Sequence, residues 1–404
     1  MSQPLTFLCV SFYFKGSAFL EACKAAGNKV FLLTHKKLED KPWPRASIDD
    51  IFYLEDDSNS PTNMEYMVEG TAWLLRQHKI DRIIALDDFD VEKAALLRET
   101  FRVPGMGQTT ARYFRDKLAM RAKAKEAGIS VPPFSSLFTD ADINHFAATV
   151  EAPWLVKPRS EASATGIRKV HSAEELWQVV NELGAKRHEY LIEQFKPGHV
   201  FHVDALTVGG KNIFCRVSQY LDTPFEVAHG GGVFRSSICE FGGEDDQALQ
   251  LLNKQVMEAF GMEYSASHTE YIKSKETGQY YFLETASRVG GAHLAELVEY
   301  SSGISLWAEW AKIEDAMAKG TSYQLPPVRN DYAGIIVSLS RFEHPDHSSF
   351  NEEEIVWRLD KPYHIGLIIQ SDNRSRIHDL LDSYVERIFR DFHASAPVPD
   401  KPLD

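Results

Sequence analysis

Two β-rich segments joined by a short polar turn constrain this chain more than any other feature of its sequence. Residues 267–273 read Ser-His-Thr-Glu-Tyr-Ile-Lys, residues 280–284 read Tyr-Tyr-Phe-Leu-Glu, and the polar residues between them include one glycine. Such a pattern predicts a β-hairpin. A turn centred near Thr277 places Glu270 directly opposite Glu284 in the hairpin ladder.

Two facing glutamates need a positive partner. Directly opposed side chains have Cβ atoms roughly 4.5 to 5.5 Å apart, and like charges at that separation destabilise the pair. Mg²⁺ meets this demand, because it prefers carboxylate oxygens and takes substrate phosphates as further ligands. Arg288 lies four residues after Glu284 and can bridge anionic oxygens, while Gly290 and Gly291 allow close backbone approach. The alternative is an edge hairpin whose two glutamates are solvated.

Size and charge limit the classes of protein to which the chain can belong. Its 404 residues predict about two to four domains. Acidic residues outnumber basic ones by 58 to 44, and the net charge of -14 argues against nucleic acid or an anionic membrane as the main partner. The apolar segment 5–14 lacks signal-peptide flanks and is too short to span a bilayer, so a buried strand is expected there. Four cysteines without a Cys-x-x-Cys pair predict reduced thiols and a cytoplasmic protein.

The N-terminal part of the chain alternates between strand and helix. The expected elements are residues 6–11, 17–26, 29–34, 64–78 and 82–86. This alternation predicts a parallel, doubly wound sheet. No Gly-x-Gly-x-x-Gly follows the first strand, so a dinucleotide site is not expected. Asp87, Asp88 and Asp90 follow the last of these strands, and helix capping is favoured over a ligand site for each of them.

Two later segments can bind anions. Lys157 ends an expected strand at 154–158 and precedes the small-residue loop 160–166, so the lysine and the loop N–H groups can hold phosphates. Segment 228–235, with three glycines between a histidine and an arginine, can receive a carboxylate or phosphate, although a surface connection fits it nearly as well. A further strand is expected at 190–195, and residues 193–198, Glu-Gln-Phe-Lys-Pro-Gly, end it in a turn.

Taken together, these motifs resemble the ATP-grasp superfamily from about Pro104 to Trp310, and most closely its carboxylate–amine ligases such as amino-acid and dipeptide ligases. The best-matching segments are Arg115-Asp116-Lys117 and Glu284-x-x-x-Arg288-Val289-Gly290-Gly291. The resemblance implies an α/β with α+β fold: a Rossmann-like N-terminal domain, an ATP-grasp fold of two α+β subdomains, and a small C-terminal α+β extension. The expected boundaries are 1–115, 116–195, 196–330 and 331–404.

The resemblance also implies site residues. Those expected to bind the nucleotide are Lys117, Lys157, Ser163, Thr165, Gly166, Glu193, Gln194 and Phe195, the Glu-Gln-Phe segment acting largely through backbone groups. Those expected to hold Mg²⁺, with Mn²⁺ as the alternative ion, are Glu270 and Glu284. Those expected to contact the reacting groups are Arg288, Arg235 and His229.

Two positions depart from the family pattern. Family members often carry Asn two residues after the second metal-binding glutamate, and here that residue is Ala286. A second Mg²⁺ therefore loses a ligand or takes water. The acid expected to bind the ribose hydroxyls has no match after Gly198, so His202 or Asp204 is assigned there instead.

The implied reaction has two steps. ATP phosphorylates a substrate carboxylate, and an amine then attacks the acyl phosphate, leaving ADP and phosphate, while the loop at 160–166 excludes water. The expected partners are a small carboxylic acid, such as an amino acid, and an amine, with a homodimer as the default oligomer. Two alternatives stay open: a carboxyphosphate-forming ATP-grasp enzyme, and a non-catalytic ATP-binding module.

Overall fold

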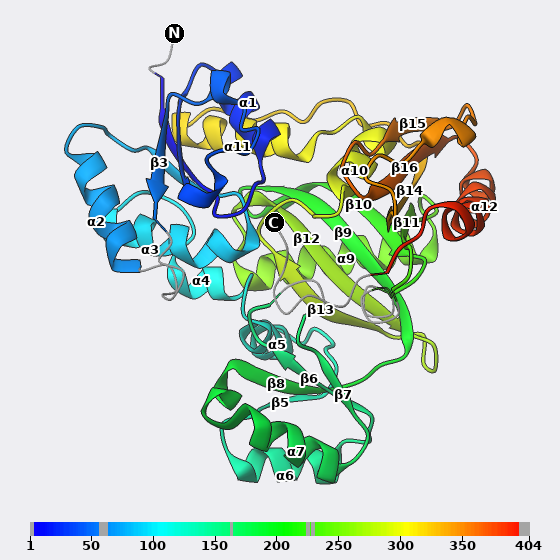
Figure 1. Ribbon diagram of the computed structural model, residues 1–404. Helices are drawn as coiled ribbons and strands as arrows, with labels where there is room; N and C mark the ends of the chain where they lie inside the picture. The colour runs from blue at the N-terminus through cyan, green and yellow to red at the C-terminus, as the bar shows by residue number, and fades with distance from the viewer. Residues whose placement is uncertain (1–3, 56–63, 162–164, 224–226, 228–230, 396–404) are drawn as a thin grey trace.

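A computed structural model describes residues 4–55, 64–161, 165–223, 227 and 231–395, which form three sheets and the helices packed on them (Figure 1). The first sheet is parallel, in the order β3-β2-β1-β4. Its strands are β1 (Thr6–Val10), β2 (Lys29–His35), β3 (Asp50–Leu54) and β4 (Arg82–Ala85). The helices of this part are α1 (Ser17–Ala25), α2 (Met64–Leu75), α3 (Val91–Phe101) and α4 (Gln108–Arg112). The doubly wound domain is confirmed, and β3 is a strand that the sequence pattern had not predicted.

A small antiparallel sheet forms a separate unit, seen at the bottom of Figure 1, with strand order β5-β8-β6-β7. Its elements are β5 (Phe134–Ser136), α6 (Asp140–Thr149), β6 (Trp154–Pro158), β7 (Arg168–Val170), α7 (Ala173–Leu183) and β8 (Tyr190–Gln194). Apolar side chains of both helices, such as Phe146 and Leu176, pack with Trp154 and Ile192 of the sheet. Helix α5 (Lys117–Glu126) lies where this unit meets the rest of the molecule.

The third sheet is the largest and has eight antiparallel strands in the order β13-β12-β9-β10-β11-β14-β16-β15. Its strands are β9 (Gly198–Val208), β10 (Lys211–Tyr220), β11 (Phe234–Ile238), β12 (Tyr264–Ser274), β13 (Tyr280–Ala286), β14 (Tyr332–Leu339), β15 (Ile355–Arg358) and β16 (His364–Ser371). Its helices are α9 (Glu244–Phe260), α10 (Leu294–Ser302), α11 (Leu306–Lys319) and α12 (Arg374–Asp391). Short 3₁₀ segments are η1 (Lys36–Leu38), η2 (Arg45–Ser47), η3 (Asp88–Asp90), η4 (Gly184–Glu189) and η5 (His347–Ser349).

The C-terminal segment is α+β, as expected, but its strands belong to this large sheet. β14 pairs with β11 in register Ser236↔Ile335, so the sheet is continuous from the hairpin β12–β13 to β15. Helix α12 packs tightly on it, because a Cβ added to Gly334 would lie 2.7 Å from side-chain atoms of Ile377 and Leu381. The division of the chain into four domains stays a prediction.

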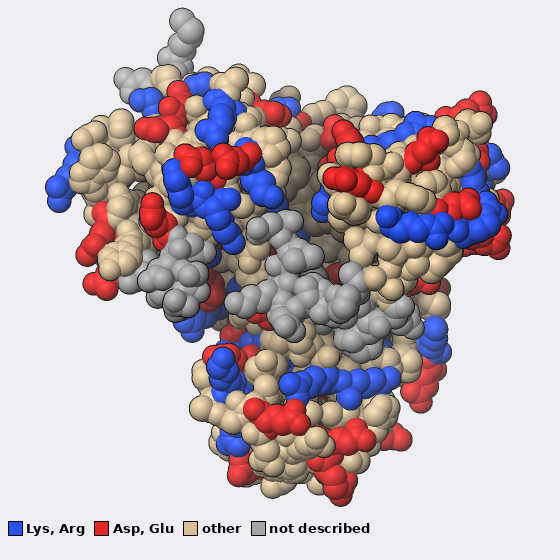
Figure 2. Space-filling model, viewed as in Figure 1, with Lys and Arg blue, Asp and Glu red and all other residues tan. Residues whose placement is uncertain are grey.

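The distribution of charge on the surface agrees with the argument, made from the net charge, against nucleic acid or an anionic membrane as the main partner. On the face drawn in Figure 2, Lys and Arg side chains alternate with Asp and Glu over the described residues, and they form no broad basic area there. In the described part of the chain no helix is both long and apolar enough to cross a membrane.

Candidate active site

The hairpin β12–β13 has the register expected from its turn. Glu270 is the cross-strand partner of Glu284, and a bulge follows immediately between Glu270 and Tyr271. On the other side of β12, His202 of β9 faces Glu270. Both glutamates line the cleft between the small unit and the large sheet, so the predicted pair of carboxylates is present and reachable.

A cavity of about 240 Å³ occupies this cleft. Eight residues predicted from the sequence line it, namely Lys117, Lys157, Thr165, Glu193, Gln194, Phe195, Glu270 and Glu284. Apolar lining comes from Pro132, Leu155, Ile167, Val200, Ile272 and Leu283. Gly166 follows Thr165 with a positive φ of 70° and lies against Pro158, where a Cβ would come within 3.0 Å of its ring. A cavity with both apolar walls and paired cations can take a flat aromatic group and phosphates.

Lys117 supplies the positive charge that the glutamate pair requires. Its Nζ lies 2.6 Å from Oε2 of Glu284 and donates to the backbone oxygen of Glu161. Burial raises the pKa of the Glu284 carboxyl, but Lys117, followed by Lys157 and Arg121, outweighs that effect and holds the pKa below its usual value. An ionised Glu284 opposite Glu270 offers the hard oxygen ligands that Mg²⁺ prefers.

Lys117 is placed by the start of helix α5. Asp116 caps that helix, because its carboxylate accepts the backbone N–H of Leu118 at 2.9 Å and pairs with Arg159. Arg121, one turn further along α5, is fully buried and donates to the backbone oxygen of Leu283 in β13. The helix is thereby attached to both the small unit and the hairpin.

Glu193 forms a buried ion pair with two cations. Arg121 donates to its Oε2 at 2.7 and 3.0 Å, and Lys157 pairs with its Oε1. Burial alone raises the pKa of Glu193, but Arg121 and Lys157 lower it to about 2. The Glu193 side chain therefore fixes the two cations. The expectation that the backbone of this segment contacts the nucleotide base stays a prediction.

A second cavity of about 300 Å³ shares Lys117, Glu161, Glu270 and Glu284 with the first. Its further polar lining is Asp88, Arg115, Tyr220, His268, Thr285 and Arg288, and its apolar lining includes Met120, Val227, Phe234, Ala286, Ala292 and Leu294. Among the described residues, Asp88 Oδ1 and Arg288 Nε are buried without a hydrogen-bond partner. The other oxygen of Asp88 accepts from Arg115 at 2.8 Å. Glu161 Oε2 is buried without a partner as well, so two acceptors and one donor are left unused at this cavity.

The three aspartates after β4 differ in role. Asp87 caps η3 by accepting the N–H of Phe89, and Asp90 accepts the N–H of Phe12. The contact of Asp87 fits the favoured capping interpretation, whereas Asp90, at the N-cap position of α3, makes no side-chain capping hydrogen bond. Asp88 accepts from Arg115 and lines the second cavity, where it lies beside space for a ligand.

Several predicted site residues do not reach either cavity. Arg235 is held by Asp222 of the β10–β11 connection at 2.8 Å and by Asp382 of α12 at 2.7 Å. Its charge is already compensated, which corrects its assignment to the reacting groups. Ser163 and His229 lie outside the described residues.

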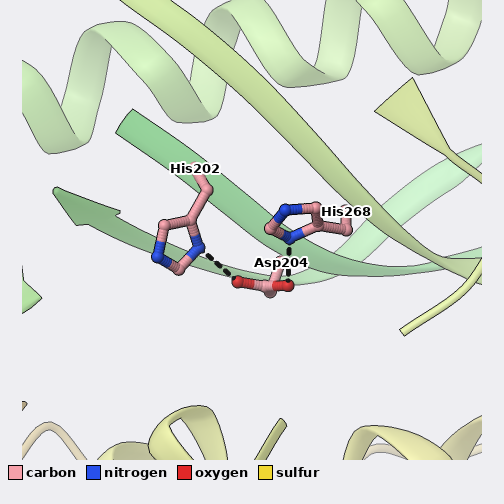
Figure 3. Close-up of side chains that lie close together, drawn as sticks. All are labelled: His202, Asp204 and His268. Carbon is pink, nitrogen blue, oxygen red and sulfur yellow. Dashed lines mark hydrogen bonds and ion pairs between the residues drawn. The ribbon is translucent and has the colours of Figure 1, made fainter. Parts of the chain in front are cut away.

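His202 and Asp204 are likewise corrected as ribose ligands. Both are fully buried, and their polar atoms bond to one another and to His268 and Ser236 (Figure 3). The pKa of His268 is lowered by burial but raised more by Asp204 and Glu270, to about 9.

Some residues that line the two cavities were not predicted from the sequence. They include Arg121, Glu161, Tyr220 and His268. Two of them carry a sequence signal: Arg121 lies four residues after Lys117 on one helix face, and His268 lies two residues before Glu270 on one strand face.

Comparisons with known proteins agree with this arrangement. A family model described as the D-ala D-ala ligase C-terminus matches residues 124–220. The L-arginine-specific L-amino acid ligase of Bacillus subtilis is 28% identical over 265 residues, 64% of this chain and 62% of that protein. A D-alanine–D-alanine ligase of Laribacter hongkongensis is 28% identical over 231 residues, 55% of this chain and 73% of that protein. The chain thus spans less than two thirds of the Bacillus relative.

Solved structures match over nearly the whole chain. An L-amino acid ligase from Bacillus licheniformis covers 97% of this chain and 99% of its own, with a TM-score of 0.77 and 17% identity. An N5-carboxyaminoimidazole synthetase from Staphylococcus aureus covers 96% and 98%, with a TM-score of 0.69 and 16% identity. The chain therefore has the ATP-grasp fold, preceded by a Rossmann-like domain. The predicted resemblance to the carboxylate–amine ligases is confirmed by the similarity to amino acid ligases and D-alanine–D-alanine ligases.

Proposed function

We propose that this protein is an ATP-dependent carboxylate–amine ligase that joins an amino acid to an amine through an acyl phosphate. The observation that carries the proposal is the junction of the two cavities at Glu270, Glu284 and Lys117. The first cavity has apolar walls and lysines that suit a nucleotide. The second cavity has polar groups, such as Asp88 and Arg288, that suit a small polar substrate. The groups that neutralise a transferred phosphoryl lie between them.

ATP is proposed to bind in the first cavity with a divalent cation. Gln194 and Phe195 would line the base, and Lys117 and Lys157 would contact the phosphates. Glu270 and Glu284 would hold Mg²⁺ or Mn²⁺, which supplies positive charge to the phosphate oxygens when bound. Ala286 adds no carboxamide ligand next to this pair.

Phosphoryl transfer needs little covalent help from the protein. In the first step an oxygen of the substrate carboxylate attacks the γ-phosphorus, and ADP leaves. In the second step the amine attacks the acyl carbon, loses a proton, and releases phosphate. Lys117 and Arg288 stabilise the negative charge on the transferred group in both steps.

The second cavity is proposed to take the amino acid. Asp88 Oδ1 can accept from an α-ammonium group, and the Arg288 guanidinium can donate to a carboxylate. Buried polar atoms without a partner are rare in proteins, so a zwitterionic ligand accounts for both. The apolar walls formed by Met120, Phe234 and Leu294 favour an uncharged side chain.

The test is to incubate the full-length protein with Mg-ATP and a matrix of amino acid pairs, measuring ADP and phosphate and identifying products by mass. We expect ADP only when one acid and one amine are both present. Bicarbonate-dependent ADP release without an amino acid would replace this proposal by carboxyphosphate chemistry, and ATP binding without turnover on any pair would replace it by a binding module.

A variant pair makes the test specific to the site. Glu284→Gln should abolish ADP formation, because it removes one proposed metal ligand. Glu276→Gln, in the turn of the same hairpin, should retain full activity. Equal turnover of the two variants would refute the metal assignment. A cytoplasmic location and a homodimer are kept as proposals alongside this function.

A further inference from the structure

A buried row of polar side chains crosses the large sheet behind Glu270. Asp204 lies between two imidazoles, accepting from His202 Nδ1 at 2.7 Å and from His268 Nδ1 at 2.9 Å (Figure 3). At one end, His202 Nε2 is 2.7 Å from Ser236 Oγ. At the other end, His268 Nε2 is 3.7 Å from Oε1 of Glu270. The row thus runs from β11 through β9 to β12 and ends at a proposed metal ligand.

The register between β9 and β12 places the side chains of this row next to one another. His268 is the cross-strand partner of Asp204, and Glu270 is that of His202. Alternate residues of a strand share one face, so the four side chains lie together on one side of the sheet. An ionised carboxylate only accepts hydrogen bonds, so both Nδ1 atoms carry protons and donate to Asp204. This fixes the orientation of each ring.

Glu270 is held on one oxygen only. Tyr220 OH donates to Glu270 Oε1 at 3.0 Å, and its ring lies 4.7 Å from that of His202. His268 approaches the same oxygen. No residue in the described part of the chain hydrogen-bonds to Oε2. The contacts therefore fix the rotation of the carboxylate and leave one oxygen for a ligand.

The same row fixes the loop that carries Arg288. A Cβ added to Gly290 would lie 2.8 Å from Asp204 Oδ1 and 2.9 Å from His268 Nδ1. The backbone at 290 therefore lies directly over the Asp204–His268 hydrogen bond, and only glycine permits that approach. The network lies between Glu270 and the Arg288 loop and contacts both.

We infer that His268, Asp204, His202 and Tyr220 are positioning residues that orient Glu270 for a divalent cation and set the Arg288 loop against it. This inference rests on the proposed function, because it takes Glu270 as a metal ligand. Hydrogen-bond partners that orient metal ligands strengthen metal affinity by roughly 10- to 100-fold. The alternative is that His202, Asp204 and His268 themselves bind a metal, since their ligand atoms lie within 4.8 Å of one another. The hydrogen bonds to Asp204 oppose it, because a metal would have to displace both ring protons.

The test measures Mn²⁺ affinity of the full-length protein in the presence of ADP, by the electron paramagnetic resonance signal of free Mn²⁺. His268→Asn keeps an amide nitrogen near Nδ1 for Asp204 but removes the group that faces Glu270. We expect its Mn²⁺ affinity to fall roughly tenfold or more. His268→Gln, which restores a nitrogen near Nε2, should recover part of that loss. ADP affinity measured in chelator should not change in either variant.

Thr269→Val is the matched control. Thr269 lies between His268 and Glu270, and its hydroxyl makes a buried 2.7 Å hydrogen bond to Thr285 on the opposite face of the strand. The Thr269→Val variant loses this buried hydrogen bond, so its unfolding midpoint should fall while its Mn²⁺ affinity stays unchanged. Tyr220→Phe is a second variant that removes a contact to Glu270 with little change in volume, and its Mn²⁺ affinity should also fall.

The outcomes separate the inference from the proposed function. Unchanged Mn²⁺ affinity in His268→Asn and Tyr220→Phe would overturn the inference and leave the proposed function standing. Stoichiometric Zn²⁺ binding that is lost in His202→Asn while the Mn²⁺ site is retained would also overturn it, in favour of a metal site at the trio. If the wild-type protein binds no Mn²⁺ with ADP, both proposals fail.

Discussion

Replacing Glu193 by Gln tests how the nucleotide cavity holds its cations. Gln keeps the shape of the side chain but removes the charge that Arg121 and Lys157 share, so it resembles the protonated glutamate. The pKa of Glu193 is lowered from 4.5 to about 2, and each pKa unit corresponds to about 1.4 kcal/mol. The variant should therefore lose about 3 kcal/mol of unfolding free energy at pH 7, which agrees with the cost of breaking a buried ion pair.

The pH dependence identifies the cause. A carboxylate whose folded pKa is depressed contributes stability that is fully present above its unfolded pKa, here 4.5, and is lost as pH falls through about 2. The difference between wild type and Glu193→Gln should therefore shrink to less than half of its value at pH 7 when the pH is lowered to 3.

Urea unfolding at both pH values measures this difference. Glu182→Gln is the control, because the Glu182–Arg168 pair lies in the same unit but is about half exposed on both sides, and it should have a much smaller effect. A difference for Glu193→Gln that is equal at pH 7 and pH 3 would refute the argument.

Three further substitutions test individual assignments. Asp88→Asn should raise the KM for the amino acid at least tenfold with little change in the KM for ATP, because it removes the negative charge proposed to face the α-ammonium group; equal shifts in both constants would contradict this role. Gly290→Ala should cost about 1 to 3 kcal/mol of stability and weaken Mn²⁺ binding, because its Cβ would meet Asp204; unchanged Mn²⁺ titrations would count against the tight approach. Arg235→Gln should leave kcat unchanged and lower the thermal unfolding midpoint, because its partners are Asp222 and Asp382; a large fall in kcat would restore its catalytic assignment.

The hairpin could be predicted because its information is local. A polar turn with one glycine sets the register, and the register places Glu270 opposite Glu284. Lys157 and the segment Glu193-Gln194-Phe195 line one cavity, as predicted. Their positions could be predicted from local sequence because each lies at the end of a strand. Helices α1 and α2 were also expected where they occur, from the alternation of strand and helix patterns in the N-terminal part.

Features that depend on contacts between residues far apart in the sequence could not be predicted. Arg235 is adjacent to an anion-binding pattern, but its partner Asp382 lies in α12, and no local pattern reveals that pair. His202 and Asp204 have the polarity of ligands, and only tertiary packing shows that they are buried. Short strands such as β3 and β15 carry too few residues for a distinct periodicity.

The pairing of β11 with β14 also bears on how this chain can be divided. β11 is an interior strand only because residues after 331 supply its neighbour. A chain shortened at that point would present β11 as a bare edge, and unpaired N–H and C=O groups of that kind recruit strands from other molecules. If the residues after 331 were exchanged with those of a related protein, β14 would have to pair with an unchanged β11. β11 and β14 would therefore have to be exchanged together.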